Sequence, residues 1–296
     1  MKKFVIKKWD KPEPYFEIPE SLTKKFEFLR RWPVRAFDVA GSGSVHSQPN
    51  ADIMILEIYR DAIAVGSPVG MTDRKFLPWI LIAMMSFGVA ETIIFIWRDI
   101  ASMYEYSFDL VGVLFDFFFA CVAVLFALIA IWTRRWMKMP PDWPILFNRR
   151  TREITYFKVN WPHLFRVKQN VPAEVMTRPW DEAKLRTYTR KVYNGRYVRT
   201  EYQMALLWGS ENDSAVLQDI VLVGNFCWFD EENMALWEHI RRYMEENGPP
   251  LNAGEKLRRP ANSVPPLRFP IEIQEAAGDP PFVASQIARL MDSLQS

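Results

Sequence analysis

Two acidic residues, Glu91 and Asp116, lie inside the two longest apolar runs of the chain, residues 76–97 and 108–132. In a membrane such a carboxylate costs a few kcal/mol and usually faces a partner group or water. In two antiparallel helices the two acids would lie at similar depth, about 9 and 12 Å from the outer ends. They indicate hydrogen-bonded contacts between helices or protomers, which we favour, or a proton or cation path.

Residues that could bind a metal or act as nucleophiles do not cluster in the sequence. His46, His163 and His239 are far apart, and none has a second His or Cys at ligand spacing. The Gly-Ser stretch at 41–44 lacks the ending of a phosphate-binding loop, and no Gly-x-Ser-x-Gly elbow occurs. We therefore expect no metal site, no cofactor and no enzymatic activity.

Tryptophan is frequent in the part of the chain that follows the apolar runs. Indole rings bury large areas, so core packing is the ordinary explanation. Exposed members would instead be binding hot spots, where Trp and Arg dominate. The candidates for contact with a partner are Trp161, Trp180 and Trp228.

Basic residues gather where the chain leaves the second apolar run. The cluster consists of Arg134, Arg135, Lys138, Arg149, Arg150 and Arg152. Such clusters mark the cytoplasmic end of a membrane span, which is the simpler interpretation. The alternative is that they bind anionic lipid headgroups.

Both apolar runs are long enough to cross a membrane, because as helices they would reach roughly 33 and 37 Å against a hydrocarbon core of about 30 Å. The connecting segment, residues 98–107, has one basic residue, whereas basic residues adjoin the outer end of each run. The positive-inside rule then places both termini in the cytoplasm. We expect transmembrane helices at 76–97 and 108–132 and a loop on the far side at 98–107.

The remaining chain divides into four parts by composition. Residues 1–50 are rich in Pro and charge and predict an irregular arm, with one short helix around residues 21–31. Residues 51–70 predict a β-hairpin that joins the sheet formed later in the chain. Residues 140–248 predict the main cytoplasmic domain, and 249–296 a Pro-rich tail with a terminal amphipathic helix from Pro280.

Within residues 140–248, strands are expected to precede one helix. Asn194-Gly195 predicts a tight type I′ turn between two strands. A further strand at 216–223 should stop at Gly224, and a helix should begin at Asp230 and end before Gly248. The predicted fold class is an α+β membrane protein: a two-helix hairpin plus an antiparallel sheet closed by a C-terminal helix.

The segment Phe147-Asn148-Arg149, followed by a basic turn into the next strand, resembles an uncharacterised family of proteobacterial two-span proteins. The resemblance covers roughly residues 50–248. It implies a pleckstrin-homology-like cytoplasmic domain, a place in the bacterial inner membrane and an immunity or accessory role beside type VI secretion effectors. The family offers no catalytic residues.

These observations lead to one principal hypothesis, a membrane-anchored module that binds a protein partner, plausibly an effector toxin. One alternative is a scaffold or lipid-sensing module that uses the basic cluster. Another is a small oligomeric channel or transporter subunit that uses Glu91 and Asp116, since the hairpin is a possible site of homo-oligomerisation. The net charge of +2 gives no reason to expect nucleic acid as a partner.

Overall fold

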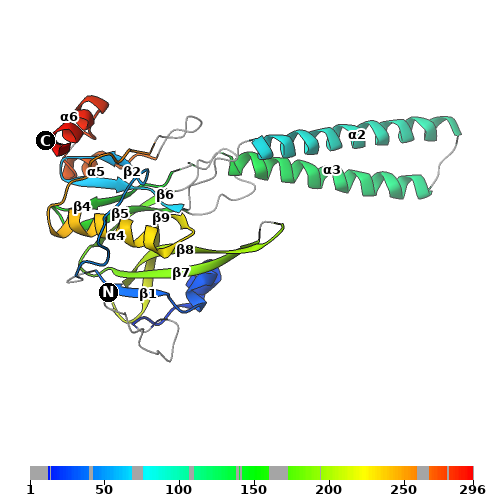
Figure 1. The fold of residues 1–296 in the computed structure, drawn as a ribbon. Helices are drawn as coiled ribbons and strands as arrows, with labels where there is room; N and C mark the ends of the chain where they lie inside the picture. Colours follow the sequence, from blue (N-terminus) through cyan, green and yellow to red (C-terminus); the bar gives the residue numbers. More distant parts are fainter. Residues whose placement is uncertain are drawn as a thin grey trace. The chain divides into compact units, whose positions relative to one another are not determined.

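The computed structural model describes residues 13–295 except 14, 40–42, 69–75, 107–109, 138–139, 141, 160–172, 194, 259–266 and 279. The chain forms two compact units, which are described separately. One consists of residues 1–71, 142–158 and 174–296, and the other of residues 72–141 and 159–173. The class is α+β, with two antiparallel sheets in the first unit and two long apolar helices in the second (Figure 1).

The first sheet has five strands in chain order. They are β2 (Ile55–Ile58), β3 (Ala62–Val65), β4 (Ile145–Asn148), β5 (Glu153–Val159) and β6 (Ala173–Pro179). β3 and β4 pair antiparallel, with Val65 opposite Ile145 and Ala62 opposite Asn148. The predicted hairpin before the apolar runs therefore does join the later sheet. β6 had no counterpart in the sequence-based prediction.

The second sheet has the order β1-β7-β8-β9. Its strands are β1 (Arg35–Asp38), β7 (Lys184–Tyr193), β8 (Val198–Gly209) and β9 (Leu217–Cys227). β1 pairs with the first half of β7. The short helix expected around residues 21–31 is present as α1 (Glu20–Lys25) and a 3₁₀ turn (Glu27–Arg30). The expectation of an otherwise irregular arm over residues 1–50 is wrong at β1.

β9 does not stop at Gly224 as predicted but continues to Cys227. Gly224 adopts φ +77°, and the pairing register with β8 shifts between Tyr202 and Met204. Between these pairs β9 has two more residues than β8, which makes a β-bulge, and a bulge bends a strand without ending it. Glycine serves here as the bulge residue.

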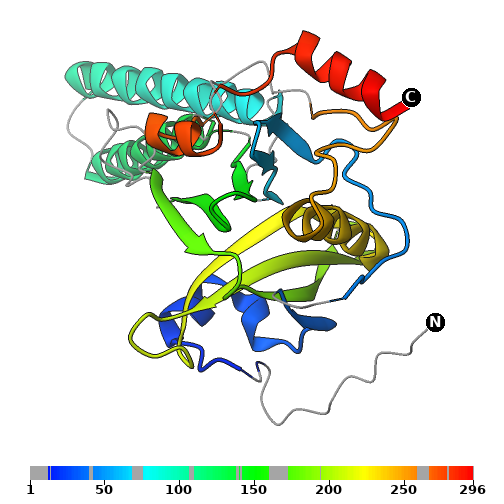
Figure 2. The same cartoon turned by 90° about the vertical axis from the view of Figure 1, so that its left-hand side faces the viewer.

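The helix α4 (Asp230–Glu245) follows β9, as predicted, and packs against β4, β8 and β9 (Figure 2). Asp230 is its first residue, as predicted, and pairs with Arg35 at 2.5 Å, while Phe229 holds the N-cap position. On its buried face, Trp237 stacks on Trp180 with 5.3 Å between the ring centroids. These indoles belong to a core to which both sheets and α4 contribute.

The tail covers the free edge of β2. The backbone N–H of Arg258 donates to the carbonyl of Ile55 at 2.8 Å, and that of Phe282 to the carbonyl of Ile58 at 2.7 Å. Two helices lie in this tail, α5 (Ile271–Ala276) and α6 (Ala284–Gln295). Ile287 of α6 packs against the core, so the terminal helix docks on its own unit. Covering an edge strand in this way prevents pairing with other chains.

The second unit is built on two antiparallel helices, α2 (Phe76–Tyr106) and α3 (Leu110–Trp136). Both are long and apolar enough to cross a membrane. α2 continues through residues 98–106, which were expected to form a loop. Phe95 contacts Phe119 with 4.7 Å between centroids, and a side-chain carbon at Gly88 would lie 2.8 Å from the ring of Phe126. The absence of a side chain at Gly88 thus lets the helices approach closely.

Candidate functional site

The outer end of the β7–β8 hairpin extends beyond the strands that flank it in the sheet. β1 pairs with β7 only as far as Thr187, and β9 pairs with β8 only from Tyr202 onward. The strands β7 and β8 pair with each other out to Tyr193 opposite Val198, so the connecting loop has four residues and not the predicted two. The outer part of the hairpin is therefore a two-stranded ribbon.

On one face of this ribbon, a single carboxylate holds two guanidinium groups. Arg190 lies opposite Glu201 in the register. Arg190 donates from Nε to Oε2 of Glu201 at 2.8 Å, and Arg199 forms an ion pair with Oε1. The Glu201 side chain is 3% exposed, whereas those of Arg190 and Arg199 are 40% and 36% exposed. The carboxylate is thus nearly buried beneath two half-exposed cations.

Two aromatic rings complete this face. The guanidinium of Arg190 lies 3.5 Å from the ring centroid of Phe226, and that of Arg199 lies 5.3 Å from the ring of Trp228. Such contacts favour a fixed orientation of the guanidinium plane. Trp228 is itself 58% exposed. We call the group Arg190, Arg199, Glu201, Phe226 and Trp228 the Arg–Trp face.

The three tryptophans proposed from sequence have different positions. Trp228 is exposed and belongs to the Arg–Trp face. Trp180 is completely buried, and its Nε1 donates to Glu245 at 2.5 Å, so its assignment as a binding residue is wrong. Its ring fills the core beside Trp237, where a partner cannot reach it. Trp161 lies outside the described residues.

The other members of the Arg–Trp face were not singled out in the sequence. A signal was present, because residues 184–200 contain six basic residues and no acidic one, with three tyrosines among them. The contribution of Glu201 depends on the cross-strand register. The contribution of Phe226 depends on the bulge at Gly224, which the sequence had indicated as the end of the strand.

The basic residues after β4 are largely engaged within their own unit. Arg152 binds Asp181 and Glu245, and its hydrogen bonds lower the pKa of the Asp181 carboxyl. Arg150 lies 3.5 Å from Asp61. Arg149 lies 4.9 Å from the ring centroid of Tyr243. These interactions reduce the charge available to lipid headgroups.

Three members of the basic cluster lie nearer the apolar helix. Arg134 is exposed, whereas Arg135 is only 6% exposed and is therefore a poor headgroup ligand. Lys138 lies outside the described residues. Among the described cluster members that lie in α3, Arg134 is the one exposed to a possible headgroup contact.

Glu91 and Asp116 do not lie at the same depth. The contacts of Gly88 with Phe126 and of Phe95 with Phe119 define the register of the two helices. In this register Asp116 is level with residue 98, so the two acids are offset by about seven residues, or roughly 10 Å. Within the described residues, Oδ1 of Asp116 is buried without a hydrogen-bond partner, whereas Glu91 is exposed. They do not form a shared site.

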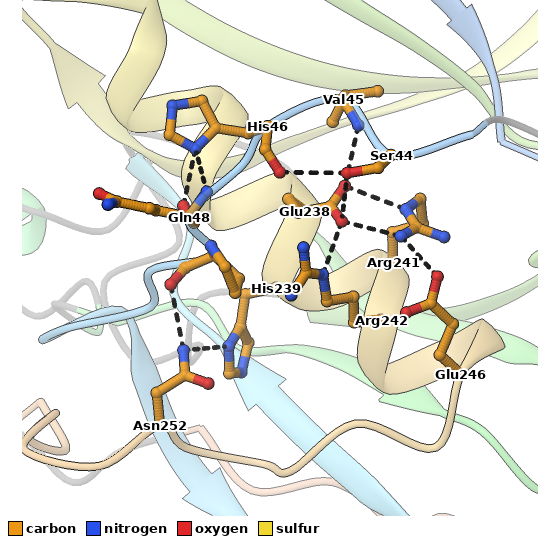
Figure 3. A network of polar contacts seen from close by, with 11 residues as sticks. Ser44, Val45, His46, Gln48, Glu238, His239, Arg241, Arg242, Glu246 and Asn252 are labelled. Carbon is orange, nitrogen blue, oxygen red and sulfur yellow. Dashed lines mark hydrogen bonds and ion pairs between the residues drawn. The ribbon is translucent and has the colours of Figure 1, made fainter.

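A second polar cluster lies on α4 and is centred on Glu238, which is fully buried (Figure 3). Its carboxylate accepts hydrogen bonds from Arg241, Arg242, the hydroxyl of Ser44 and the backbone N–H of Val45. Burial opposes ionisation, but these donors lower the pKa of Glu238 to about 2. The cluster fixes the segment after the Gly-Ser stretch onto α4 and leaves no open position for a ligand.

The histidines do not assemble a catalytic or metal site in the described part of the chain. Nδ1 of His46 contacts the carbonyl of Gln48, and Nδ1 of His239 contacts Asn252. Burial lowers the pKa of His239. Among the described residues, no group of three or more His, Cys, Asp or Glu side chains is arranged to hold a metal ion. His163 lies outside them.

Fold and site together define the chain as an α+β protein with two helices long enough to span a membrane and a sheet unit that presents an exposed face of arginine and tryptophan. The chain belongs to the Family of unknown function (DUF6708), whose model matches residues 120–277. The match begins within α3 and ends directly after α5. Comparisons with curated proteins and with solved structures gave no significant match.

Proposed function

We propose that this protein is a membrane-anchored module that binds a protein partner through the Arg–Trp face and has no catalytic activity of its own. The carrying observation is the exposed Trp228 beside Arg190 and Arg199, both held in place by the nearly buried Glu201. Trp and Arg are the residues most enriched in binding hot spots, and pre-ordered side chains lose less entropy on association.

The proposed anchor is the pair α2 and α3, which cross the inner membrane of a bacterium as a multi-pass hairpin. Their large apolar side chains are mostly exposed, as a lipid environment requires. The chain enters α2 after β3 and leaves α3 before β4, and these strands pair with each other. The two outer ends of the hairpin must then lie on one side of the membrane. The basic flanks make that side the cytoplasm.

The strand order supports a pleckstrin-homology-like fold for the soluble unit. β3 to β6 form a meander of four strands, β7 to β9 a meander of three, and α4 follows directly. Four strands, three strands and a closing helix are the pattern of that fold. In this proposal β1 and β2 are additions, and the membrane hairpin is an insertion between the first two strands of the first meander.

The partner that we propose is a type VI secretion effector toxin, which the protein neutralises at the membrane. Co-expression in a host cell with a toxin encoded beside its gene tests this directly. The full-length protein should restore growth, and the Trp228→Ala variant should restore it less. Growth arrest that the wild-type protein leaves unchanged would exclude the immunity role against that toxin.

Binding itself is measured on the detergent-solubilised full chain with the purified, inactivated toxin. Trp228→Ala and Arg199→Ala should each weaken affinity at least tenfold, as expected for hot spots worth about 2 kcal/mol or more. Lys191→Ala is the matched control, because Lys191 pairs with Thr200 on the opposite face of the ribbon. Equal losses in all three variants would contradict a binding site on the Arg–Trp face.

A further inference from the structure

The ribbon carries more basic than acidic residues. Of the six basic residues at 184–200, Lys184 pairs with Asp38 at 3.0 Å, and Arg186 pairs with the buried Glu13 at 2.8 Å. The other four are Arg190, Lys191, Arg196 and Arg199. Glu201 is the acid that pairs with Arg190 and Arg199. The outer ribbon is therefore suited to an anionic partner.

The arginine pair also has unused hydrogen-bonding capacity. A guanidinium has five N–H donors, and Glu201 takes Nε and one terminal nitrogen of Arg190 and one terminal nitrogen of Arg199. Nε of Arg199 is buried and out of reach of a partner, but the Arg190 and Arg199 side chains are 40% and 36% exposed and keep terminal N–H groups that Glu201 does not take. Through these terminal nitrogens a second carboxylate could bridge the two guanidiniums from the solvent side without displacing Glu201.

Next to these donors lies an apolar surface. Trp228, directly after β9, is 58% exposed and lies against the guanidinium of Arg199. Its exposed ring provides a contact area for an apolar side chain, beside cations that attract a carboxylate. Charge and apolar contact thus occur within one small area.

We propose that the Arg–Trp face recognises an acidic segment of a protein, in which one carboxylate bridges Arg190 and Arg199 and a nearby apolar side chain packs on Trp228. The inference rests on the proposed function, because it names the chemistry of the partner for that same face. A guanidinium group can form two parallel hydrogen bonds with one carboxylate, whereas the ammonium group of lysine cannot.

The geometry favours a protein segment over an anionic lipid surface. The rings of Phe226 and Trp228 are partly covered by guanidinium groups and are less free to enter a bilayer interface. Because Glu201 fixes the two arginines in one orientation, the face suits a partner of defined shape. Lipid headgroups are attracted by charge alone and do not require fixed arginines.

The test is a selection from a phage-displayed library of random peptides against the detergent-solubilised full chain, with counter-selection on the Arg190→Ala/Arg199→Ala variant. Enriched peptides should carry Asp or Glu near an aromatic or aliphatic residue. A synthetic copy should bind at least about tenfold more weakly to Arg199→Ala and clearly more weakly to Arg199→Lys. Lys191→Ala, on the opposite face, should stay within about twofold, apart from long-range charge effects that salt screens.

Three results would overturn the inference. One is enrichment of peptides without acidic residues, or of none. Another is full affinity of Arg199→Lys for the acidic peptide. The third is binding of the full chain in neutral nanodiscs to phosphatidylglycerol vesicles that depends on Arg190 and Arg199 while acidic peptides do not compete. Selected peptides that lack acids but lose binding in Trp228→Ala would leave the proposed function intact and remove only this inference.

Discussion

Glu238 is a buried carboxylate that the fold keeps ionised, so the stability of its unit should depend on pH in the acidic range. Its folded pKa of about 2 lies below the ordinary value of 4.5, because Arg241, Arg242, Ser44 and Val45 donate to it. A depressed pKa contributes stability that is fully present above the ordinary value and lost as pH falls from 4.5 towards 2. Glu238→Gln should lower the free energy of unfolding at neutral pH by about 3 kcal/mol.

The measurement is thermal unfolding of the full chain in detergent between neutral and acidic pH. The stability of Glu238→Gln should fall less steeply below pH 4.5 than that of the wild type. Glu246→Gln is the control, since Glu246 also pairs with Arg241 but its side chain is 53% exposed. Parallel pH profiles for wild type and Glu238→Gln would show that the cluster does not stabilise the fold.

Trp180 is buried in the core and Trp228 is exposed, so the same substitution should affect stability very differently at the two positions. Trp180→Ala should destabilise the protein by about 3–5 kcal/mol, because it opens a cavity beside Trp237. Trp228→Ala should change stability by less than about 1 kcal/mol, because most of the ring is in water. Urea unfolding of the full chain in detergent compares them. Similar midpoints for both variants would contradict the assigned burial.

The sequence does not distinguish the buried tryptophan from the exposed one. The sequence indicated that tryptophans in the soluble part matter, but burial depends on strand pairing between distant segments. Trp180 is buried because it follows β6 and meets Trp237 on α4. Arg190 and Arg199 come together through Glu201 because β7 and β8 pair in one register. Neither contact has a local sequence signal.

At the scale of elements, the predictions that held rest on strong local signals. The start of α4, with an acidic cluster in its first turn, and its end before Gly248 were predicted correctly, as were the β7–β8 hairpin and both apolar helices. β1 was missed because four residues with no alternating pattern become a strand only by pairing with β7. The apolar helix α2 was predicted too short because its last turns are polar.

Gly224 shows how a single residue decides the path of an element. Its φ of +77° is unfavourable for a residue with a side chain, and a Cβ there would lie 2.7 Å from a methyl carbon of Leu236. Gly224→Ala should therefore destabilise the protein by about 2 kcal/mol, the sum of backbone strain and a clash with α4. Thermal unfolding of the full chain measures it.

Gly195 is the matched control for this prediction. It also has positive φ, +90°, but a Cβ there meets nothing within 4 Å. Gly195→Ala should cost only the backbone term, about 1 kcal/mol. If Gly195→Ala proves as destabilising as Gly224→Ala, the contact between the bulge and α4 contributes nothing.

At the scale of the whole molecule, the apolar hairpin is an insertion within a β-sheet. β3 and β4 pair directly, yet residues 66–144 separate them in sequence. The sheet thus does not depend on the helices for its pairing, and the core of the soluble unit contains residues from both sides of the insertion.

This topology predicts that the unit containing both sheets folds without the apolar hairpin. Replacing residues 72–141 by a short Gly-Ser linker should leave β3 and β4 joined by a simple connection, because Val65 already lies opposite Ile145. The shortened protein should be soluble without detergent, since the removed helices carry most of the exposed large apolar side chains. It should unfold cooperatively and bind the partner of the full chain with similar affinity. The same deletion with Trp180→Ala should not fold, which serves as the control. Insoluble protein from the deletion alone would show that the hairpin is required to assemble the sheet.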